Sequence, residues 1–579
     1  MKYVMKELLR LKKELLVIVL TVVGTTLCTL GLPFFLARLI DHAIPDKNYV
    51  HVLEIGGIMI LLVVVGIICG IITSRISAVV SMSVGRSLRS QVFRKVQYFS
   101  QTEIDRFSAS SLITRTNNDI SQIQVFLNQC LRIAIQAPIM CICGILLAIS
   151  NSPSLSMVLV ISVPLMIIAL TIVARIAVPL STKIQKKIDR VNLVLREKLT
   201  GVRVIRAFGT IDFESRRFDE INRDYSRNNK KLQRTTNSLM PLMTLILSAT
   251  AAMVMLMAAN QYVNKGVDYT IGEVMAIIQY IMQIMLAVIM LTIVFVMLPR
   301  AATAASRARE LLETEPVIQN KPETRNNTEQ KGYLTFKDVS FTYPGADEPA
   351  IQGLSFEAKP GEVTALIGGT GMGKTTAISL IPRLYDVTEG QVLVDGIDVR
   401  DYDTEVLRAK IGYVPQKAVL FSGTIDSNIA FGSEEADEYR IEEAVKIAQS
   451  YDFVSKKEQG FESPVSQGGS NFSGGQRQRL AIARAIVRKP EIYVFDDSFS
   501  ALDFKTDKAL RSALSKETEE ATVVIVAQRI STIMDADRII VIEKGKVAGM
   551  GTHSQLLKDC DIYREIALSQ MSEEDLKNA

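Results

Sequence analysis

Five long runs without a charged side chain, one of them long enough for two helices, occupy the first 300 residues, and they constrain the fold more than any other feature of the chain. A bilayer core is about 30 Å thick and needs about 20 apolar residues per helix. Each run meets or nearly meets that length. The sequence therefore predicts six membrane-spanning helices: 15–37, 55–74, two within 133–174, 235–264 and 274–299.

The charge of the intervening segments predicts the orientation of these spans. The segment 175–234 holds sixteen Lys or Arg against seven Asp or Glu, and 75–132 is also basic. Basic segments stay on the cytosolic side. We therefore expect a multi-pass protein of the cytoplasmic membrane, with the N-terminus and the region after residue 300 in the cytosol. The remaining linkers are short and hold few basic residues: 38–54, 151–156 and 265–273.

The two basic segments read as helical, which predicts spans that continue far into the cytosol. Each pair of helical extensions then needs a short turn at its tip, and the candidates are 102–110 and 205–213. A basic stretch can also bind nucleic acid, but the acids interleaved here indicate a solvated helix face. We therefore expect no nucleic-acid partner.

Composition fits a chain with an apolar part and a soluble part. Hydrophobic residues make up 48% and charged residues 22%, with a net charge of +5. Of the six cysteines, Cys141 and Cys143 are only two positions apart, too close for a CxxC redox or zinc pair. No disulfide framework is expected, which fits a reducing cytosol on the soluble side.

The pattern changes after residue 300 to a helical stretch, a polar linker, and then short strands, Gly-rich turns and helices. Alternation of strands and helices indicates an α/β domain. We expect a transmembrane domain at 1–299 with six helices and long cytosolic extensions. A linker at 300–332 and this α/β domain at 333–579, with a C-terminal tail, should follow.

A phosphate loop follows the apolar strand predicted at 363–367. Residues 368–375 read Gly-Gly-Thr-Gly-Met-Gly-Lys-Thr, a full match to GxxxxGK[ST] between a strand and a helix. Its glycines let backbone N–H groups cradle phosphate oxygens, its Lys reaches the β and γ phosphates, and its Thr offers a hydroxyl to Mg²⁺. The loop predicts ATP and Mg²⁺ as ligands. The expected contacts are Gly368, Thr370, Gly371, Gly373, Lys374, Thr375 and Thr376.

Two further segments belong to the same chemistry. An apolar strand at 492–496 ends in Asp496, where a magnesium-coordinating carboxylate belongs. Between this strand and the phosphate loop, a turn of small residues opens the helical run 479–487 and forms a second anion site. This turn is Ser473, Gly474, Gly475 and Gln476. One nucleotide does not need two such sites in one domain, so the second is better explained by ATP held on a partner chain.

Together, the six spans, the phosphate loop, the turn at 473–476 and Asp496 resemble an ABC exporter half-transporter over nearly the whole chain. The resemblance implies a multidomain fold: an all-α six-helix transmembrane domain followed by an α/β P-loop nucleotide-binding domain. It implies an ATPase-coupled translocase in a lipid bilayer, working as a dimer with a second half-transporter. Each ATP would lie between one chain's phosphate loop and the other's turn, here called the signature. The cytosolic tips would be coupling helices.

The resemblance also assigns roles to single residues. Tyr343, in Phe-Thr-Tyr-Pro, matches the aromatic residue that stacks on adenine, although an ordinary strand-end Tyr is the alternative. Gln416, in Tyr-Val-Pro-Gln, matches the glutamine that touches Mg²⁺ and water. Residues 500–503, Ser-Ala-Leu-Asp, match the loop that lies across the dimer interface.

Two positions depart from the family pattern. The hydrolytic Glu is replaced by Asp497, one methylene shorter, and the His that contacts the γ-phosphate is replaced by Gln528, which cannot become a cation. Together they predict a site that binds ATP and hydrolyses it slowly, while the intact signature serves a partner. This asymmetry resembles the degenerate subunit of heterodimeric bacterial multidrug exporters. A heterodimer is favoured, and a slow homodimer stays open.

The spans indicate hydrophobic or amphipathic cargo, such as drugs, lipids or peptides. Ten of the 21 methionines lie in the last two spans, which suits varied apolar ligands or plain packing. Gln279 and Gln283, one helical turn apart, contact either cargo or neighbouring helices. A membrane protein that senses ATP without pumping is the rival, which the intact signature disfavours. A second rival is a soluble-type ABC ATPase, which the six spans strongly disfavour.

Overall fold

The computed structural model of the chain describes residues 2–45, 49–265, 269–326, 328–433 and 435–571. The chain forms two compact units. Unit 1 is Met1–Gln97 with Ala109–Thr314, and unit 2 is Tyr98–Ser108 with Glu315–Ala579. The cytosolic tip that the sequence predicts near residue 102 therefore belongs to unit 2.

Unit 1 is entirely helical in the residues that the structure describes, and two of its segments are π-helical. The helices are α1 (Lys2–Leu8), α2 (Lys12–Arg38), α3 (Tyr49–Gln97), α5 (Ala109–Thr114), α6 (Ile120–Asn151), α7 (Pro153–Ser156), α8 (Val158–Thr200), α9 (Val202–Ala207), α10 (Ile211–Asn237), α11 (Leu239–Lys265) and α12 (Ile271–Glu313). The π-helical segments are η1 (Leu39–Ala43) and η2 (Arg115–Asp119).

Six helical segments are long and apolar enough to cross a membrane, which confirms the six predicted spans. Only 6% of the most apolar stretch of α3 is buried within the chain, and no segment exceeds 33%. Apolar surface on this scale needs a non-aqueous neighbour. The segments are Lys12–Ala43, Tyr49–Gln97, Ala109–Asn151, Pro153–Thr200, Ile211–Asn264 and Ile271–Glu313.

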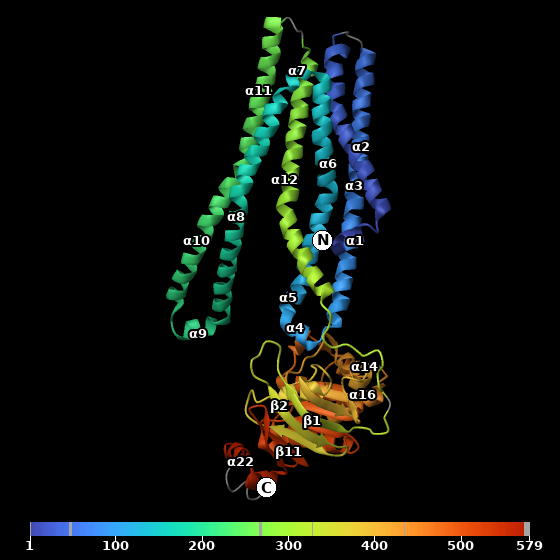
Figure 1. Ribbon diagram of the computed structural model, residues 1–579, viewed down its shortest axis with the longest axis vertical. Helices are drawn as coiled ribbons and strands as arrows, with labels where there is room; N and C mark the ends of the chain where they lie inside the picture. The colour runs from blue at the N-terminus through green and yellow to red at the C-terminus, as the bar shows by residue number, and fades with distance from the viewer. Residues whose placement is uncertain (1, 46–48, 266–268, 327, 434, 572–579) are drawn as a thin grey trace. The chain divides into compact units, whose positions relative to one another are not determined.

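The extensions that the sequence predicts beyond the membrane spans are helical. Helix α3 continues to Gln97, and α8 and α10 form a long hairpin whose tip is α9 (Figure 1). The predicted turn at 102–110 coincides with α4 (Gln101–Phe107), and the one at 205–213 with the end of α9 and the start of α10. Helix α12 passes without interruption through Pro299. The boundaries predicted at 299 and 332 stay predictions.

Within unit 1, α2 packs along α3 and α6 packs along α12, while α8, α10 and α11 lead away from these four as an arm (Figure 1). The Gln283 amide donates a hydrogen bond to the Thr29 carbonyl at 3.3 Å. This contact fits the helix-to-helix interpretation of Gln283. All six cysteines are free, as expected.

Unit 2 contains α4 and an α/β domain. Its strands are β1 (Leu334–Phe341), β2 (Ile351–Ala358), β3 (Val363–Ile367), β4 (Glu389–Val394), β5 (Ile397–Asp398), β6 (Ile411–Val414), β7 (Gly423–Thr424), β8 (Pro464–Val465), β9 (Ile492–Asp496), β10 (Thr522–Val526), β11 (Arg538–Glu543) and β12 (Lys546–Gly551). Its α-helices are α4, α13 (Lys374–Leu380), α14 (Thr404–Ala409), α15 (Ile425–Ala430), α16 (Glu438–Ile447), α17 (Tyr451–Ser455), α18 (Gly474–Ile486), α19 (Phe504–Glu517), α20 (Ile530–Ile533), α21 (His553–Asp559) and α22 (Asp561–Leu568). Two 3₁₀ turns complete it: η3 (Gly460–Glu462) and η4 (Gln467–Gly469).

The largest sheet of unit 2 has the strand order β12-β11-β3-β10-β9-β6, in which only β12 is antiparallel. A second sheet, β2-β1-β4-β5, is antiparallel. Strands β9 and β10, which lie inside this sheet, are buried at every position. Continuous apolar strands of this kind are typical of a parallel sheet covered on both faces. The predicted strands at 333–341, 363–367 and 492–496 are β1, β3 and β9.

Candidate nucleotide site

The residues of the predicted site follow four adjacent parallel strands. The phosphate loop follows β3, Gln416 follows β6, Asp497 follows β9, and Gln528 follows β10. Val526 at the end of β10 is level with Asp496 on one side and with Leu366 on the other. Ligands of open α/β sheets bind at the carboxyl edge of the strands. The topology therefore brings these segments to one edge although they are far apart in the chain.

The phosphate loop needs its glycines. Gly371 and Gly373 have φ angles of +79° and +93°, which side chains rarely adopt. A Cβ at Gly373 would lie 2.4 Å from the Ala350 carbonyl oxygen, and one at Gly368 would lie 2.2 Å from that of Ile542. The loop is thus a close backbone approach that glycine alone permits. Thr370, also predicted to contact ATP, is exposed.

Lys374 is a buried cation at the base of this loop. Its side-chain ammonium donates to the carbonyl oxygens of Gly368 and Gly369, both at 2.7 Å. Burial lowers the pKa of Lys374, and the charges of Asp497 and Asp496 oppose that shift. Among the described residues, no carboxylate lies within ion-pair distance of this ammonium. A buried ammonium held only by carbonyl groups fits an anionic ligand such as a triphosphate.

Thr375 and Asp496 form the predicted metal pair. The Thr375 hydroxyl donates to Asp496 Oδ1 at 2.9 Å. Burial raises the pKa of the Asp496 carboxyl, and the hydrogen bond from Thr375 opposes the rise. A carboxylate and a hydroxyl beside a phosphate cradle are the oxygen ligands that Mg²⁺ accepts. The residues present therefore fit Mg²⁺-ATP.

Asp497 contacts the other two residues predicted to act in hydrolysis, Gln528 and Gln416. Its Oδ2 accepts a hydrogen bond from the Gln528 amide at 3.0 Å and one from the Gln416 amide at 3.3 Å. The carboxylate is 9% exposed, and its backbone takes a left-handed φ of +47°. An Asp tolerates this conformation better than most residues. Both departures from the family pattern thus meet at one carboxylate oxygen.

Tyr343 is held in place from two sides. Its hydroxyl lies 3.0 Å from the Thr376 hydroxyl, at the start of α13. The rings of Phe341 and Tyr385 meet it edge-on, with centroids 4.9 and 5.4 Å away. The ring is only partly buried. Tyr343 therefore lies next to the phosphate loop, where an adenine-stacking residue is expected.

The signature turn is built separately from the phosphate loop. The Ser473 hydroxyl accepts from the Gln476 N–H at 3.3 Å, and the Ser473 N–H donates to the Gln476 side chain at 3.0 Å. This capping box starts α18. Ser473 and Gly474 are exposed, and a Cβ at Gly474 would meet nothing within 4 Å. The four residues form no hydrogen bond to the phosphate loop within the described part of the chain.

Several residues of the site have no motif to reveal them. The Arg529 guanidinium donates to the Ser500 carbonyl at 3.1 Å, and the Gln570 amide contacts the backbone of 528–530. The Tyr385 hydroxyl donates to Asp105 of α4 at 2.7 Å. Each of these contacts joins residues at least 29 positions apart, so sequence spacing carries no signal for them.

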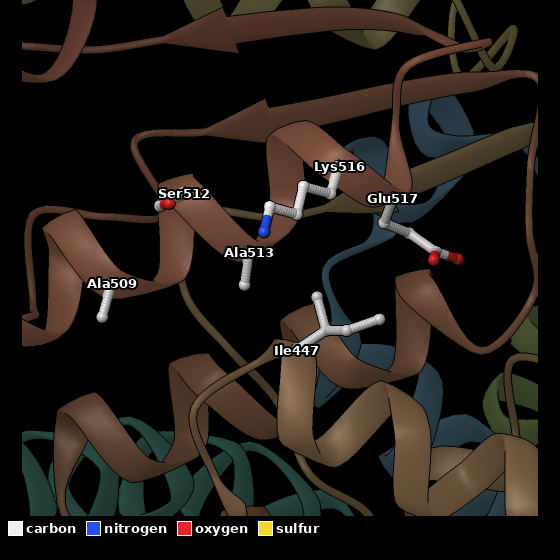
Figure 2. A pocket seen from close by; sticks show the side chains of 6 residues that line it. All are labelled: Ile447, Ala509, Ser512, Ala513, Lys516 and Glu517. Carbon is white, nitrogen blue, oxygen red and sulfur yellow. The ribbon is translucent and has the colours of Figure 1, made fainter.

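A hollow in unit 2 lies away from this chemistry. It has a volume of about 550 Å³ and opens between α16 and α19 (Figure 2). None of its lining residues belongs to the predicted site, and the hollow is open to solvent. The lining residues are Ile447, Ala509, Ser512, Ala513, Lys516 and Glu517.

Comparison with known proteins agrees with both units. Residues 15–288 match the ABC transporter transmembrane region, and residues 351–500 match the ABC transporter family. An uncharacterized ABC transporter ATP-binding protein of Mycobacterium tuberculosis is 39% identical over 94% of each chain. An ATP-dependent lipid A-core flippase of Haemophilus influenzae is 29% identical, over 96% of this chain and 94% of that one.

Among solved structures, a bacterial Atm1-family ABC exporter with ATP bound matches 97% of this chain and 99% of its own, with a TM-score of 0.80 and 26% identity. The match extends over the membrane helices and the α/β domain together. Six apolar helices, a phosphate loop and a signature turn in one chain, with relatives of the same length, point to one conclusion. This chain belongs to the ABC transporter family and has the architecture of an ABC exporter half-transporter.

Proposed function

We propose that this chain is the degenerate-site half of a heterodimeric exporter in the cytoplasmic membrane. Its own phosphate loop, with Thr375, Asp496 and Gln416 around Mg²⁺, holds ATP and hydrolyses it slowly. Its signature, Ser473 to Gln476, completes a competent site on the partner. Bound ATP supplies the energy of phosphoryl transfer, with Mg²⁺ neutralising charge on the phosphates.

The observation that carries this proposal is the pair of amide contacts on Asp497. A general base must accept a proton from water, and because the Oδ2 of Asp497 already accepts from Gln528 and Gln416, that role is left to Oδ1. Gln528 is neutral at every pH and brings no positive charge to a transferring phosphoryl group. The Asp497 side chain is shorter than a Glu, and Gln528 carries no positive charge, so both positions are poorly suited to hydrolysis. The groups proposed to hold ATP are nevertheless present.

The dimer is supported by surfaces that the chain leaves uncovered. Ser473 and Gly474 are exposed, as expected of residues that meet a nucleotide on another chain. The tip around α9 exposes Val204, Phe208 and Phe213, at 60%, 78% and 62%. Apolar side chains at a cytosolic tip fit a protein partner better than water. A homodimer uses the same surfaces, so the choice of a heterodimer rests on Asp497 and Gln528.

Cargo is proposed to be hydrophobic or amphipathic. The spans are apolar over their membrane-crossing lengths, with mean hydropathies of 2.1 to 3.0. A lipid flippase among the relatives supports an amphipathic substrate class. The Gln283 Nε2 donates to the Thr29 carbonyl, but its Oε1 is buried without a hydrogen-bond partner, so both Gln279 and Gln283 stay candidates for cargo contact.

The catalytic part of the proposal is tested on the purified chain alone and on the double variant Asp497→Glu, Gln528→His. The wild-type chain should bind Mg²⁺-ATP but turn it over far below about 10 per second, the median for enzymes. The double variant should hydrolyse at least about tenfold faster, since it regains reach and charge. A wild-type rate near the median, or no gain in the double variant, contradicts the proposal.

The orientation is tested by thiol labelling in a cysteine-free background. Ser154→Cys, exposed between α6 and α8, should react with an impermeant reagent added to intact cells. Asn222→Cys, exposed on α10, should react only after permeabilisation. The reverse pattern would place the ATP-binding region outside.

A further inference from the structure

The side chain of Gln570, just after α22, forms two hydrogen bonds to the backbone of one short segment. Its Nε2 donates to the Gln528 carbonyl at 2.8 Å, and its Oε1 accepts from the Ile530 N–H at 2.9 Å. A glutamine amide can donate and accept at the same time along an extended backbone. It therefore holds residues 528–530 as a neighbouring strand would.

Two of these residues, Gln528 and Arg529, also contact the nucleotide site. The Gln528 amide donates to Asp497 at 3.0 Å, and the Arg529 guanidinium donates to the carbonyl of Ser500 at 3.1 Å. Residue 530 starts α20. The segment 528–530 thus has two sets of contacts: one to Asp497 and Ser500 of the site, and one to the side chain of Gln570.

Gln570 itself is fixed by the core of unit 2. Tyr563 and Ala567 of α22 are fully buried, and the backbone N–H groups of Gln570 and Met571 donate to the Ala567 carbonyl at 3.1 and 2.9 Å. The Met571 side chain packs against the same core. The amide of Gln570 therefore starts from a fixed backbone position.

We propose that Gln570 is a positioning residue of the nucleotide site, which keeps the Gln528 amide directed at Asp497. It acts through the backbone of 528–530 and does not touch the nucleotide. The proposal rests on the proposed function only in taking this edge of the sheet as an ATP site. It requires neither a heterodimer nor slow hydrolysis.

Two variants separate the contacts. Gln570→Ala loses both hydrogen bonds. Gln570→Glu keeps an acceptor for the Ile530 N–H but loses the donor to the Gln528 carbonyl, and it places a negative oxygen against that carbonyl. Ser569→Ala is the matched control, because its hydroxyl bonds only within the C-terminal segment, to the Ile566 carbonyl at 2.7 Å.

The full-length chain, in complex with its partner if it has one, is examined by two measurements. The first is hydrogen exchange in a peptide covering 528–533, and the second is the release rate of a fluorescent ATP analogue. In Gln570→Ala, exchange and release should both rise, release by about three- to tenfold, as for loss of one or two hydrogen bonds. In Gln570→Glu, the Ile530 amide should stay protected while release is as fast as in Gln570→Ala.

A merely structural role of Gln570 would not produce a protected Ile530 amide together with fast release of the analogue. Loosening of the whole C-terminal segment would expose peptides covering 561–571 in both variants, and faster release accompanied by that exposure overturns the proposal. Unchanged release in both variants, with the Ser569→Ala control at the wild-type value, also overturns it. Failure of the wild-type chain to bind the analogue would instead contradict the ATP site itself, so the two failures are distinguishable.

Discussion

At the scale of single residues, burial of Asp496 opposes folding and favours metal binding. The side chain is 2% exposed, and burial raises the pKa of its carboxyl above the ordinary 3.8. Because the folded state binds this proton more tightly than the unfolded state, stability is lost as the pH rises from 3.8 through the raised value. At neutral pH the ionised carboxylate therefore destabilises the nucleotide-free domain.

We expect Asp496→Asn to raise the Tm of the nucleotide-free protein at pH 7 and to abolish the Mg²⁺-dependent part of its stabilisation by ATP. The difference from the wild type should shrink as the pH approaches 3.8. Calorimetry with ATP, with and without Mg²⁺, checks both effects. A lower Tm for the nucleotide-free variant would show that the Thr375 hydrogen bond outweighs the cost of burial.

Tyr343 allows a direct test of base stacking. Tyr343→Ala should weaken ATP binding by about 1–3 kcal/mol, the usual value of a base on an aromatic ring. Tyr343→Phe keeps the ring and loses only the contact with Thr376, so it should cost about 1 kcal/mol or less. Tyr439→Ala, at a tyrosine 76% exposed on α16, is the control. Direct ATP titration decides, and a silent Tyr343→Ala would show that the aromatic residue is misassigned.

Much of the site can be read from the sequence because its residues directly follow strands. Asp496, Asp497 and Gln528 each stand at a strand end or within two residues of one, where a parallel sheet gathers its ligands. The amide contacts on Asp497 were not predictable, since they depend on side-chain directions rather than spacing. Gln570 carries no motif and lies 42 positions from Gln528.

At the scale of elements, α4 packs as part of unit 2 although its sequence lies between two membrane spans. The Glu103 carboxylate, 3% exposed, accepts from the Val317 N–H at 3.1 Å. Asp105 accepts from the Tyr385 hydroxyl, and the Tyr385 ring touches that of Tyr343. A continuous set of contacts therefore joins α4 to the residue proposed to hold adenine.

Tyr385→Phe tests whether that hydrogen bond holds α4. Loss of a bond to a charged partner costs about 1.5–3 kcal/mol, so exchange in peptides covering 101–107 should be at least about tenfold faster. ATP affinity should change far less. Tyr402→Phe is the control, because its hydroxyl bonds the Val394 carbonyl in another part of the unit. If peptides covering 101–107 exchange equally fast in Tyr385→Phe and Tyr402→Phe, the hydrogen bond from Tyr385 to Asp105 does not hold α4.

Helices, spans and tips are predictable because long apolar runs and short strands have strong periodic signals. The π-helical segments are not. Asp41 of η1 accepts from Thr270 and Gly272 at the start of α12, and Arg115 of η2 pairs with Glu310 near its end. Neither segment has a composition that marks it. These contacts fix α12 at both ends and form only in the folded unit.

At the scale of the whole molecule, damage from mutation should be unequal in the assembled transporter. In the proposed heterodimer, Gly475→Asp would place a carboxylate against the partner's triphosphate, and its Cβ would lie 3.1 Å from the Ala501 carbonyl oxygen. It should nearly abolish turnover by the pair. Asp497→Asn should cost far less, because under the same proposal it alters a site that is already poor at hydrolysis.

Both variants are measured as co-expressed complexes at saturating ATP, so that binding losses are not mistaken for catalytic ones. ATP binding to the Gly475→Asp chain alone serves as the control and should be retained. Equal damage from the two variants would mean that this chain hydrolyses its own ATP, and would favour the homodimer.

The uncovered tip at α9 bears on how the cell keeps subunits in proportion. None of the residues of α9 or α10 is buried within the chain, and Phe208 is 78% exposed. A copy made in excess of its partner would present this apolar surface to chaperones and proteases, which act on such surfaces and lower abundance. If the proposed heterodimer forms, this surface would couple the abundance of the chain to that of its partner. Deletion of the partner gene should then shorten the half-life of this chain, whereas a homodimer has no such partner gene.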